Sequence, residues 1–72
     1  MPEVTVYALE GRSVEDKHGL LRDITAAVVK NFGVAPDLVT VQIVEAQADL
    51  KSKGGIPYSV RHPRDIGKTT QD

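Results

Sequence analysis

The sequence predicts a small α/β (α+β) domain built from a single βαβ unit. Three observations predict it: strand-like alternation over Glu3–Leu9, an apolar stripe at helical spacing over Val14–Phe32, and a second strand-like run over residues 38–45. This order favours a right-handed crossover that leaves the two strands parallel. At 72 residues the chain is one domain at most. We predict a folded domain over residues 1–61 and a polar tail over residues 62–72.

The first strand is predicted to be covered on both faces. Its side chains divide into two sets, with Val4, Val6 and Ala8 on one face and Thr5, Tyr7 and Leu9 on the other. Both sets are largely apolar, which is typical of a sheet inside a larger assembly.

The predicted helix carries signals at both ends. Ser13 is a good N-cap, and Asp16 three residues later makes a variant of a capping box. Gly33 can end the helix in a left-handed conformation. Lys17 and Lys30 are expected mostly on the solvent side. The apolar stripe consists of Leu20, Leu21, Ile24, Ala27, Val28 and Phe32.

The chain after the second strand is predicted to contain little regular structure. Residues 46–53 are expected to form a polar loop. Residues 54–60 begin with two glycines and favour a short turn followed by a terminal strand.

Size and composition predict that the chain assembles. A chain this short buries only about 60% of its unfolded surface, and it has no cysteine for a disulfide. Two strands and one helix are not independently stable. Two units could pair into a four-stranded sheet with two helices on one face. The other face would still carry Tyr7, Leu9 and Val44, which invites further association.

Charge and hydropathy exclude several classes of partner. The formal net charge of −1 argues against nucleic acid, because neutralising a phosphate backbone needs a basic surface. No apolar run reaches the roughly 18 residues of a membrane span, and the first residues do not resemble a signal peptide. We therefore expect a soluble, cytoplasmic protein. The sequence also has no cluster of cysteine and histidine residues for a metal, and we expect no bound metal or cofactor.

Pro2 is a candidate catalytic residue. The chain has no cysteine nucleophile, and His18 and His62 are not spaced as a pair of metal ligands. Removal of Met1 would give Pro2 a free secondary amine. Burial in an apolar pocket and a nearby arginine would lower the pKa of that amine, so that it could act as a general base near pH 7. The alternative is that Pro2 merely begins a strand, where proline loses no ladder bond.

Several short motifs resemble the 4-oxalocrotonate tautomerase family. They are Pro2 ahead of the first strand, LEGRS at residues 9–13, the EDK opening of the helix, AP before the second strand, VTVQIVE, and GGIP at residues 54–57. The resemblance covers about residues 2–61. It implies a βαβ fold, dimers that assemble as hexamers, no cofactor, and a setting in the catabolism of aromatic compounds.

The resemblance also implies roles for three residues. Pro2 would move a proton between carbons of a small unsaturated 2-hydroxy or 2-oxo acid, as general base and then as acid. Arg12 would bind a substrate carboxylate, because a guanidinium is always charged and can bind it bidentately. The backbone N–H of Leu9 would polarise the substrate carbonyl. A solvated turn arginine is the alternative for Arg12.

Two candidate substrate-binding positions depart from the family pattern. Thr40 stands where the resemblance places a second arginine, and Lys51 stands where it places an aromatic wall of the pocket. A threonine cannot stabilise a developing dienolate as an arginine does. Lys51 either supplies the missing cation from a new position or is a solvated loop lysine. Arg61 or Arg64 of a neighbouring chain could also supply it.

Three interpretations of function stay open. The first is a tautomerase or isomerase acting on a small carboxylic acid, in a homohexamer. The second is a catalytically silent subunit of a mixed hexamer, favoured by Thr40 and Lys51. The third keeps Pro2 but hydrates or dehalogenates an unsaturated acid, with Glu45 as a candidate for activating water.

Overall fold

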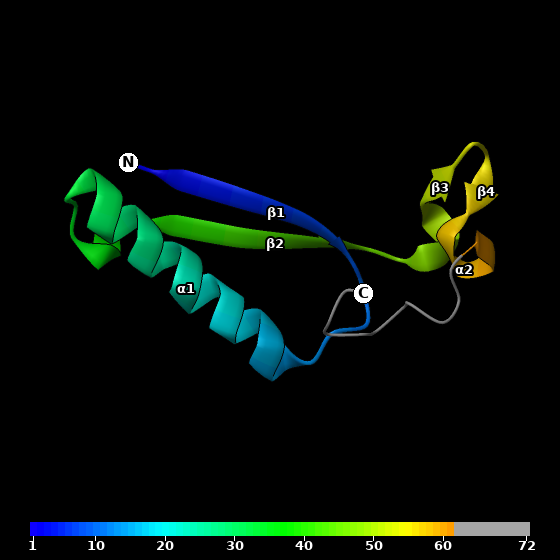
Figure 1. Ribbon diagram of the computed structural model, residues 1–72, viewed down its shortest axis with the longest axis horizontal. Helices are drawn as coiled ribbons and strands as arrows, with labels where there is room; N and C mark the ends of the chain where they lie inside the picture. Colours follow the sequence, from blue (N-terminus) through cyan, green and yellow to red (C-terminus); the bar gives the residue numbers. More distant parts are fainter. Residues whose placement is uncertain (62–72) are drawn as a thin grey trace.

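The computed structural model describes residues 1–61 and shows the predicted βαβ unit (Figure 1). Strand β1 (Glu3–Leu9) leads into helix α1 (Val14–Phe32), and strand β2 (Thr40–Ala46) returns beside β1. The strands are parallel, in a register that runs from Glu3 opposite Thr40 to Leu9 opposite Ala46. The predicted tail over residues 62–72, which contains His62 and Arg64, lies outside the described residues.

Helix α1 has the bounds and caps that the sequence predicts. The Ser13 hydroxyl accepts a hydrogen bond from the Asp16 N–H at 3.0 Å. Gly33 has φ 68° and donates its N–H to the Val29 carbonyl at 2.9 Å. The left-handed conformation favours glycine because a Cβ is disfavoured there. Local sequence therefore sets both ends of α1.

Strand β2 begins two residues later than predicted. Pro36 opens a short 3₁₀ helix, η1 (Pro36–Leu38), because its fixed φ suits the first turn of a helix. The Val39 N–H closes that turn on the Pro36 carbonyl at 3.0 Å. Leu38 therefore belongs to the turn, and the ladder starts where the Thr40 N–H reaches the Pro2 carbonyl at 3.0 Å.

The segment after β2 is more ordered than the predicted polar loop, so that prediction is wrong. A short 3₁₀ helix, η2 (Ala48–Leu50), precedes a hairpin of β3 (Ser52–Lys53) and β4 (Ile56–Pro57). Gly54 and Gly55 make the turn with φ 63° and 82°, which is the backbone of a tight hairpin. The expected terminal strand is confirmed only at Ile56–Pro57, because helix α2 (Tyr58–Arg61) follows at once.

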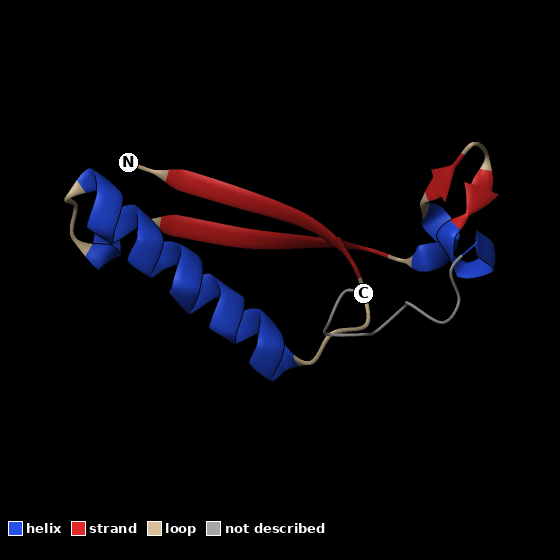
Figure 2. Cartoon of the chain, in the orientation of Figure 1, coloured by secondary structure: helices blue, strands red, loops and turns tan. Residues whose placement is uncertain are grey.

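Helix α1 covers one face of the β1–β2 sheet and leaves the other open (Figure 2). Val4, Val6 and Ile43 are half-buried towards α1, whereas Tyr7 on the opposite face is 73% exposed and its register partner Val44 is 37% exposed. Among residues 1–61, Ala48 is the one buried apolar residue, and it is still 7% exposed. A single chain therefore has almost no core.

The shape of the chain agrees with this thin core. The η2–α2 segment extends beyond the end of β2, away from α1 (Figure 1). The chain measures 43 × 21 × 19 Å, with a radius of gyration of 14.8 Å. A compact domain of this length has a radius of gyration of about 11 Å. Within residues 1–61, no helix combines the length and the apolar character needed to cross a membrane.

Candidate functional site

Pro2 lies at the start of the sheet, next to the first residue of β2. Its carbonyl accepts the Thr40 N–H at 3.0 Å, and the residue itself is half-buried. Met1 is 86% exposed. Proline has no N–H to give to a ladder, so this position costs the sheet no hydrogen bond. Pro2 is thus fixed through its carbonyl, while its nitrogen side faces the exposed Met1.

Arg12 lies in the loop between β1 and α1. Gly11 turns the chain there with φ 125°, a conformation that favours glycine. Ahead of it, the Glu10 N–H donates to the Ala46 carbonyl at 2.9 Å. Arg12 is half-buried, and its guanidinium makes no hydrogen bond or ion pair with any of residues 1–61. A guanidinium in that state can accept a carboxylate bidentately.

Leu9, the last residue of β1, directs its N–H to the open edge of the sheet. The Thr40 N–H donates to the Pro2 carbonyl, and the Glu10 N–H donates to the Ala46 carbonyl. The backbone groups of every second residue from Pro2 to Glu10 therefore face β2. Successive backbone groups of a parallel strand point to opposite edges. The N–H of Leu9 therefore points away from β2, where a ligand carbonyl or another strand can use it.

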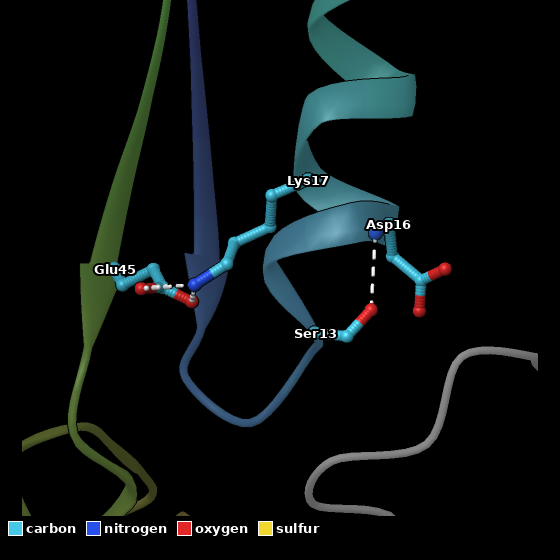
Figure 3. Close-up of polar contacts among 4 residues, drawn as sticks. All are labelled: Ser13, Asp16, Lys17 and Glu45. Atoms are coloured by element: carbon cyan, nitrogen blue, oxygen red, sulfur yellow. Dashed lines mark hydrogen bonds and ion pairs between the residues drawn. The ribbon is translucent and has the colours of Figure 1, made fainter.

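An ion pair links the first turn of α1 to β2 (Figure 3). The Lys17 Nζ lies 3.1 Å from Oε1 and 3.3 Å from Oε2 of Glu45. The two side chains are 27% and 31% exposed. Lys17 is therefore turned towards the sheet, whereas the sequence predicted that it would face solvent. Glu45, considered above for activating water, is bound to that lysine.

Lys51 is half-buried within the hairpin segment, residues 48–61, which comprises η2, the β3–β4 hairpin and α2. Its Nζ lies 5.9 Å from the centre of the Tyr58 ring, within cation–π range. Its carbonyl accepts the Tyr58 N–H at 2.8 Å. Lys51 is thus held against an aromatic ring rather than freely solvated. Nearby, Arg61 donates from Nη1 to the Lys53 carbonyl at 3.4 Å.

The candidate residues do not form one cluster in a single chain. Pro2 and Thr40 lie at one end of the sheet, and Leu9 and Arg12 lie at the other end (Figure 1). Seven residues of β1 separate the two ends, a span of about 23 Å at roughly 3.3 Å per residue. A small carboxylic acid cannot touch Pro2 and Arg12 of the same chain.

Two further observations concern the rest of the described surface. An apolar groove of about 540 Å³ runs along α1 and contains none of the candidate residues; it is lined by Leu21, Arg22, Thr25, Ala26, Val29, Lys30 and Pro36. No group of His, Asp or Glu side chains within residues 1–61 is arranged to hold a metal ion.

The chain is similar to known tautomerases in sequence and in fold. Residues 2–50 match the model of a protein family described as "Tautomerase enzyme". A probable tautomerase of Bradyrhizobium diazoefficiens is 56% identical over 61 residues, which are 85% of this chain and 91% of that protein. The 2-hydroxymuconate tautomerase of Bacillus subtilis is 41% identical over 49 residues, which are 68% of this chain and 79% of that protein.

A solved structure shares the fold. The heterohexameric 4-oxalocrotonate tautomerase of Chloroflexus aurantiacus superimposes with a TM-score of 0.75 and is 33% identical. The match covers 83% of this chain and 97% of the other. The family match over residues 2–50, which include Pro2, Leu9, Arg12 and Thr40, agrees with these likenesses. The chain therefore belongs to the tautomerase family.

Proposed function

We propose that the protein moves a proton within a small unsaturated 2-oxo or 2-hydroxy acid, with the nitrogen of Pro2 as general base and then as acid. The observation that carries this proposal is the state of Pro2 in a member of the tautomerase family. Its carbonyl is held by β2 while the preceding Met1 is exposed. Removal of Met1 leaves a secondary amine at the edge of the sheet.

The reaction needs only one group that can take up and return a proton. The Pro2 amine removes the proton from the 2-hydroxyl group of an enol, and the same proton is then delivered to a carbon of the conjugated chain. The enol becomes a ketone and the amine is regenerated. Such acid–base help contributes typically 10²–10⁴-fold to a rate.

Arg12 is the proposed anchor for the substrate carboxylate. It is half-buried and without a partner in the described residues. The outward N–H of Leu9 lies three residues before it and is suited to the oxygen that gains charge as the enolate forms. We assign both residues to substrate binding at the same end of the sheet.

Thr40 and Lys51 complete the proposed binding site. Thr40 is the neighbour of Pro2 and offers a hydroxyl group in place of a cation. Lys51 brings an ammonium group that is held over Tyr58. We propose that Lys51 supplies the second positive charge from the hairpin segment. Arg61 is less suited to the role because it already donates to the Lys53 carbonyl.

Copies of the chain must cooperate if Pro2 and Arg12 act on one substrate molecule, because about 23 Å of β1 separates them at roughly 3.3 Å per residue. We propose a hexamer in the cytoplasm in which Arg12 of one copy serves Pro2 of another. A hexamer is in keeping with the heterohexameric relative of Chloroflexus aurantiacus. Because that relative is a heterohexamer, a hexamer of two chain types remains the alternative for this chain.

A second candidate function is that of a silent subunit in such a mixed hexamer. Thr40, at the position that adjoins Pro2, favours it because a threonine carries no charge to stabilise an enolate. Hydration or dehalogenation is less favoured, because the carboxylate of Glu45 is bound to Lys17 and is not free to activate water.

The test is an enol-ketonisation assay with phenylenolpyruvate and 2-hydroxymuconate. We expect activity in the wild type, and a loss of about 10²–10⁴-fold in Pro2→Ala, the range of general acid–base catalysis. Pro36→Ala, a matched change in η1, is expected to retain most of the activity. Equal inactivity of wild type and Pro2→Ala, in protein shown by mass spectrometry to lack Met1, would overturn the proposal in favour of a silent subunit.

A further inference from the structure

The loop that carries Arg12 is tied at both ends to consecutive residues of β2. At its start, the Glu10 N–H donates to the Ala46 carbonyl at 2.9 Å. At its end, the Lys17 Nζ contacts both carboxylate oxygens of Glu45, at 3.1 and 3.3 Å. Residues 10–17 therefore form a bridge whose two ends rest on Glu45 and Ala46.

The far end of this bridge belongs to the helical turn that begins at Ser13, the residue after Arg12 (Figure 3). The Ser13 hydroxyl accepts the Asp16 N–H at 3.0 Å, and the Ser13 carbonyl accepts the Lys17 N–H at 3.1 Å. These two bonds make Ser13 and Lys17 part of one helical turn. A movement of Lys17 relative to β2 therefore moves Ser13, and Arg12 is the next residue along the chain.

We propose that the Lys17–Glu45 ion pair positions Arg12 for the substrate carboxylate. This role rests on the proposed function, in which the Arg12 guanidinium binds that carboxylate. The pair fixes the first turn of α1 against the end of β2, and so fixes the place from which the guanidinium reaches out. Neither Lys17 nor Glu45 touches the substrate; both act through Arg12.

The surroundings of the pair suit this role. Both side chains are about 70% shielded from solvent, at 27% and 31% exposed, so water screens their attraction less than that of a fully exposed pair. On the other side of Arg12, the chain passes through Gly11, whose φ of 125° is open mainly to glycine. Glycine therefore suits the turn on one side of Arg12, and the ion pair holds the chain on the other side.

The pair also differs from a device that only stabilises α1. The helix has its own N-cap at Ser13 and its own C-cap at Gly33. Removal of the ion pair leaves both caps in place. We therefore expect a folded protein in which Arg12 is displaced, and the loss falls on substrate binding.

The experiment measures KM and kcat for phenylenolpyruvate in three variants of the pair: Lys17→Met, Glu45→Gln, and the reversed pair Lys17→Glu with Glu45→Lys. The two single variants are expected to raise KM about tenfold and to change kcat less than about threefold, as for a misplaced binding group. The reversed pair is expected to restore KM, since it recreates the attraction and puts an acidic residue in the first turn of α1, where the helix dipole favours it.

Glu15→Gln is the matched control. Glu15 lies in the same turn, is exposed, and makes no hydrogen bond or ion pair with another side chain of residues 1–61. Its KM is expected to stay at the wild-type value. Circular dichroism at the assay concentration checks that each variant is folded, and the reversed pair tests the role even if one single variant does not fold.

The Arg12→Ala background separates positioning from general damage. If the pair acts through Arg12, Lys17→Met raises KM in the wild type and has no further effect once Arg12 is gone. An unchanged KM in both single variants, or the same fold-change in the Arg12→Ala background, would overturn the role. An inactive wild type would overturn the proposed function and this role together, whereas an active wild type with unaffected variants would overturn this role alone.

Discussion

Arg12 is the residue on which the proposed binding of substrate depends most. It is half-buried and follows Gly11 in a loop that two contacts with β2 hold in place. Its guanidinium has no competing carboxylate among residues 1–61. A cation that is partly shielded and has no partner within residues 1–61 is suited to a small anionic ligand. Its state in the described part of the chain is therefore consistent with a binding role.

Replacement of this residue tests that role directly. We expect Arg12→Ala to lower kcat/KM for phenylenolpyruvate by about thirtyfold, because a hydrogen bond to a charged group is worth about 2 kcal/mol. Arg12→Lys should recover part of the loss, since it restores the charge without the bidentate geometry. Steady-state kinetics of the three proteins is the measurement. Arg12→Ala with wild-type kcat/KM would show that Arg12 is a solvated turn residue.

For single residues, the sequence predicts those structural roles that depend on neighbours in the chain. The cap at Ser13 and the turn at Gly33 follow from neighbouring residues and are found as predicted. The ion pair of Lys17 and Glu45 was missed, because the two residues are 28 positions apart. Their contact depends on the register of β1 and β2 and on the rotation of α1, and hydropathy alone assigned Lys17 to solvent.

At the scale of elements, the strands and helix that local pattern strongly marks are predicted well. The bounds of β1 and α1 agree with the prediction, and the parallel pairing of β1 and β2 is confirmed. The predicted start of β2 at Leu38 was two residues too early. Leu38 is apolar and fits a strand pattern, but Pro36 begins a 3₁₀ turn that includes it. A single backbone constraint thus outweighed the hydropathy pattern.

The hairpin segment after β2 is the element that the sequence predicts least. Its polar composition suggested a loop, yet Ala48 within it is 7% exposed. The side chain of Ser59 hydrogen-bonds to Asp49, and the backbone of Tyr58 bonds to Lys51. The first contact joins residues ten positions apart and the second joins residues seven positions apart, so no short periodic pattern reveals them. The candidate site residue Lys51 owes its placement to this unpredicted structure.

For the whole molecule, the structure shows which apolar side chains a single chain leaves exposed. One face of the sheet leaves Tyr7 73% exposed, and Phe32 and Leu50 are 69% and 77% exposed. The groove of about 540 Å³ along α1 adds an apolar surface on the helix. These exposed apolar side chains could be buried against other copies of the chain in an assembly. Further copies of the chain are the proposed partners.

A charge on the open face of the sheet tests this assembly. Tyr7→Glu is expected to lower the mass measured by sedimentation from that of a hexamer and to weaken the helical circular dichroism signal, because an unpaired carboxylate is costly to bury. His18→Glu, at an exposed position of α1, is the matched control and should sediment as the wild type does. A wild-type chain that sediments as a folded monomer at micromolar concentration would contradict the proposed hexamer.

The proposed catalysis depends on the nitrogen of Pro2 as the base, and that nitrogen is a free amine only when Met1 has been removed. While Met1 is attached, the nitrogen belongs to a tertiary amide and cannot take up a proton. The most direct measurement compares the activity on phenylenolpyruvate of two preparations. One lacks Met1, and the other is produced while the methionine aminopeptidase of the expression host is inhibited; intact mass gives the fraction of chains without Met1 in each. We predict that activity follows the fraction of chains without Met1. Equal activity of the chain that keeps Met1 would show that the Pro2 nitrogen is not the base.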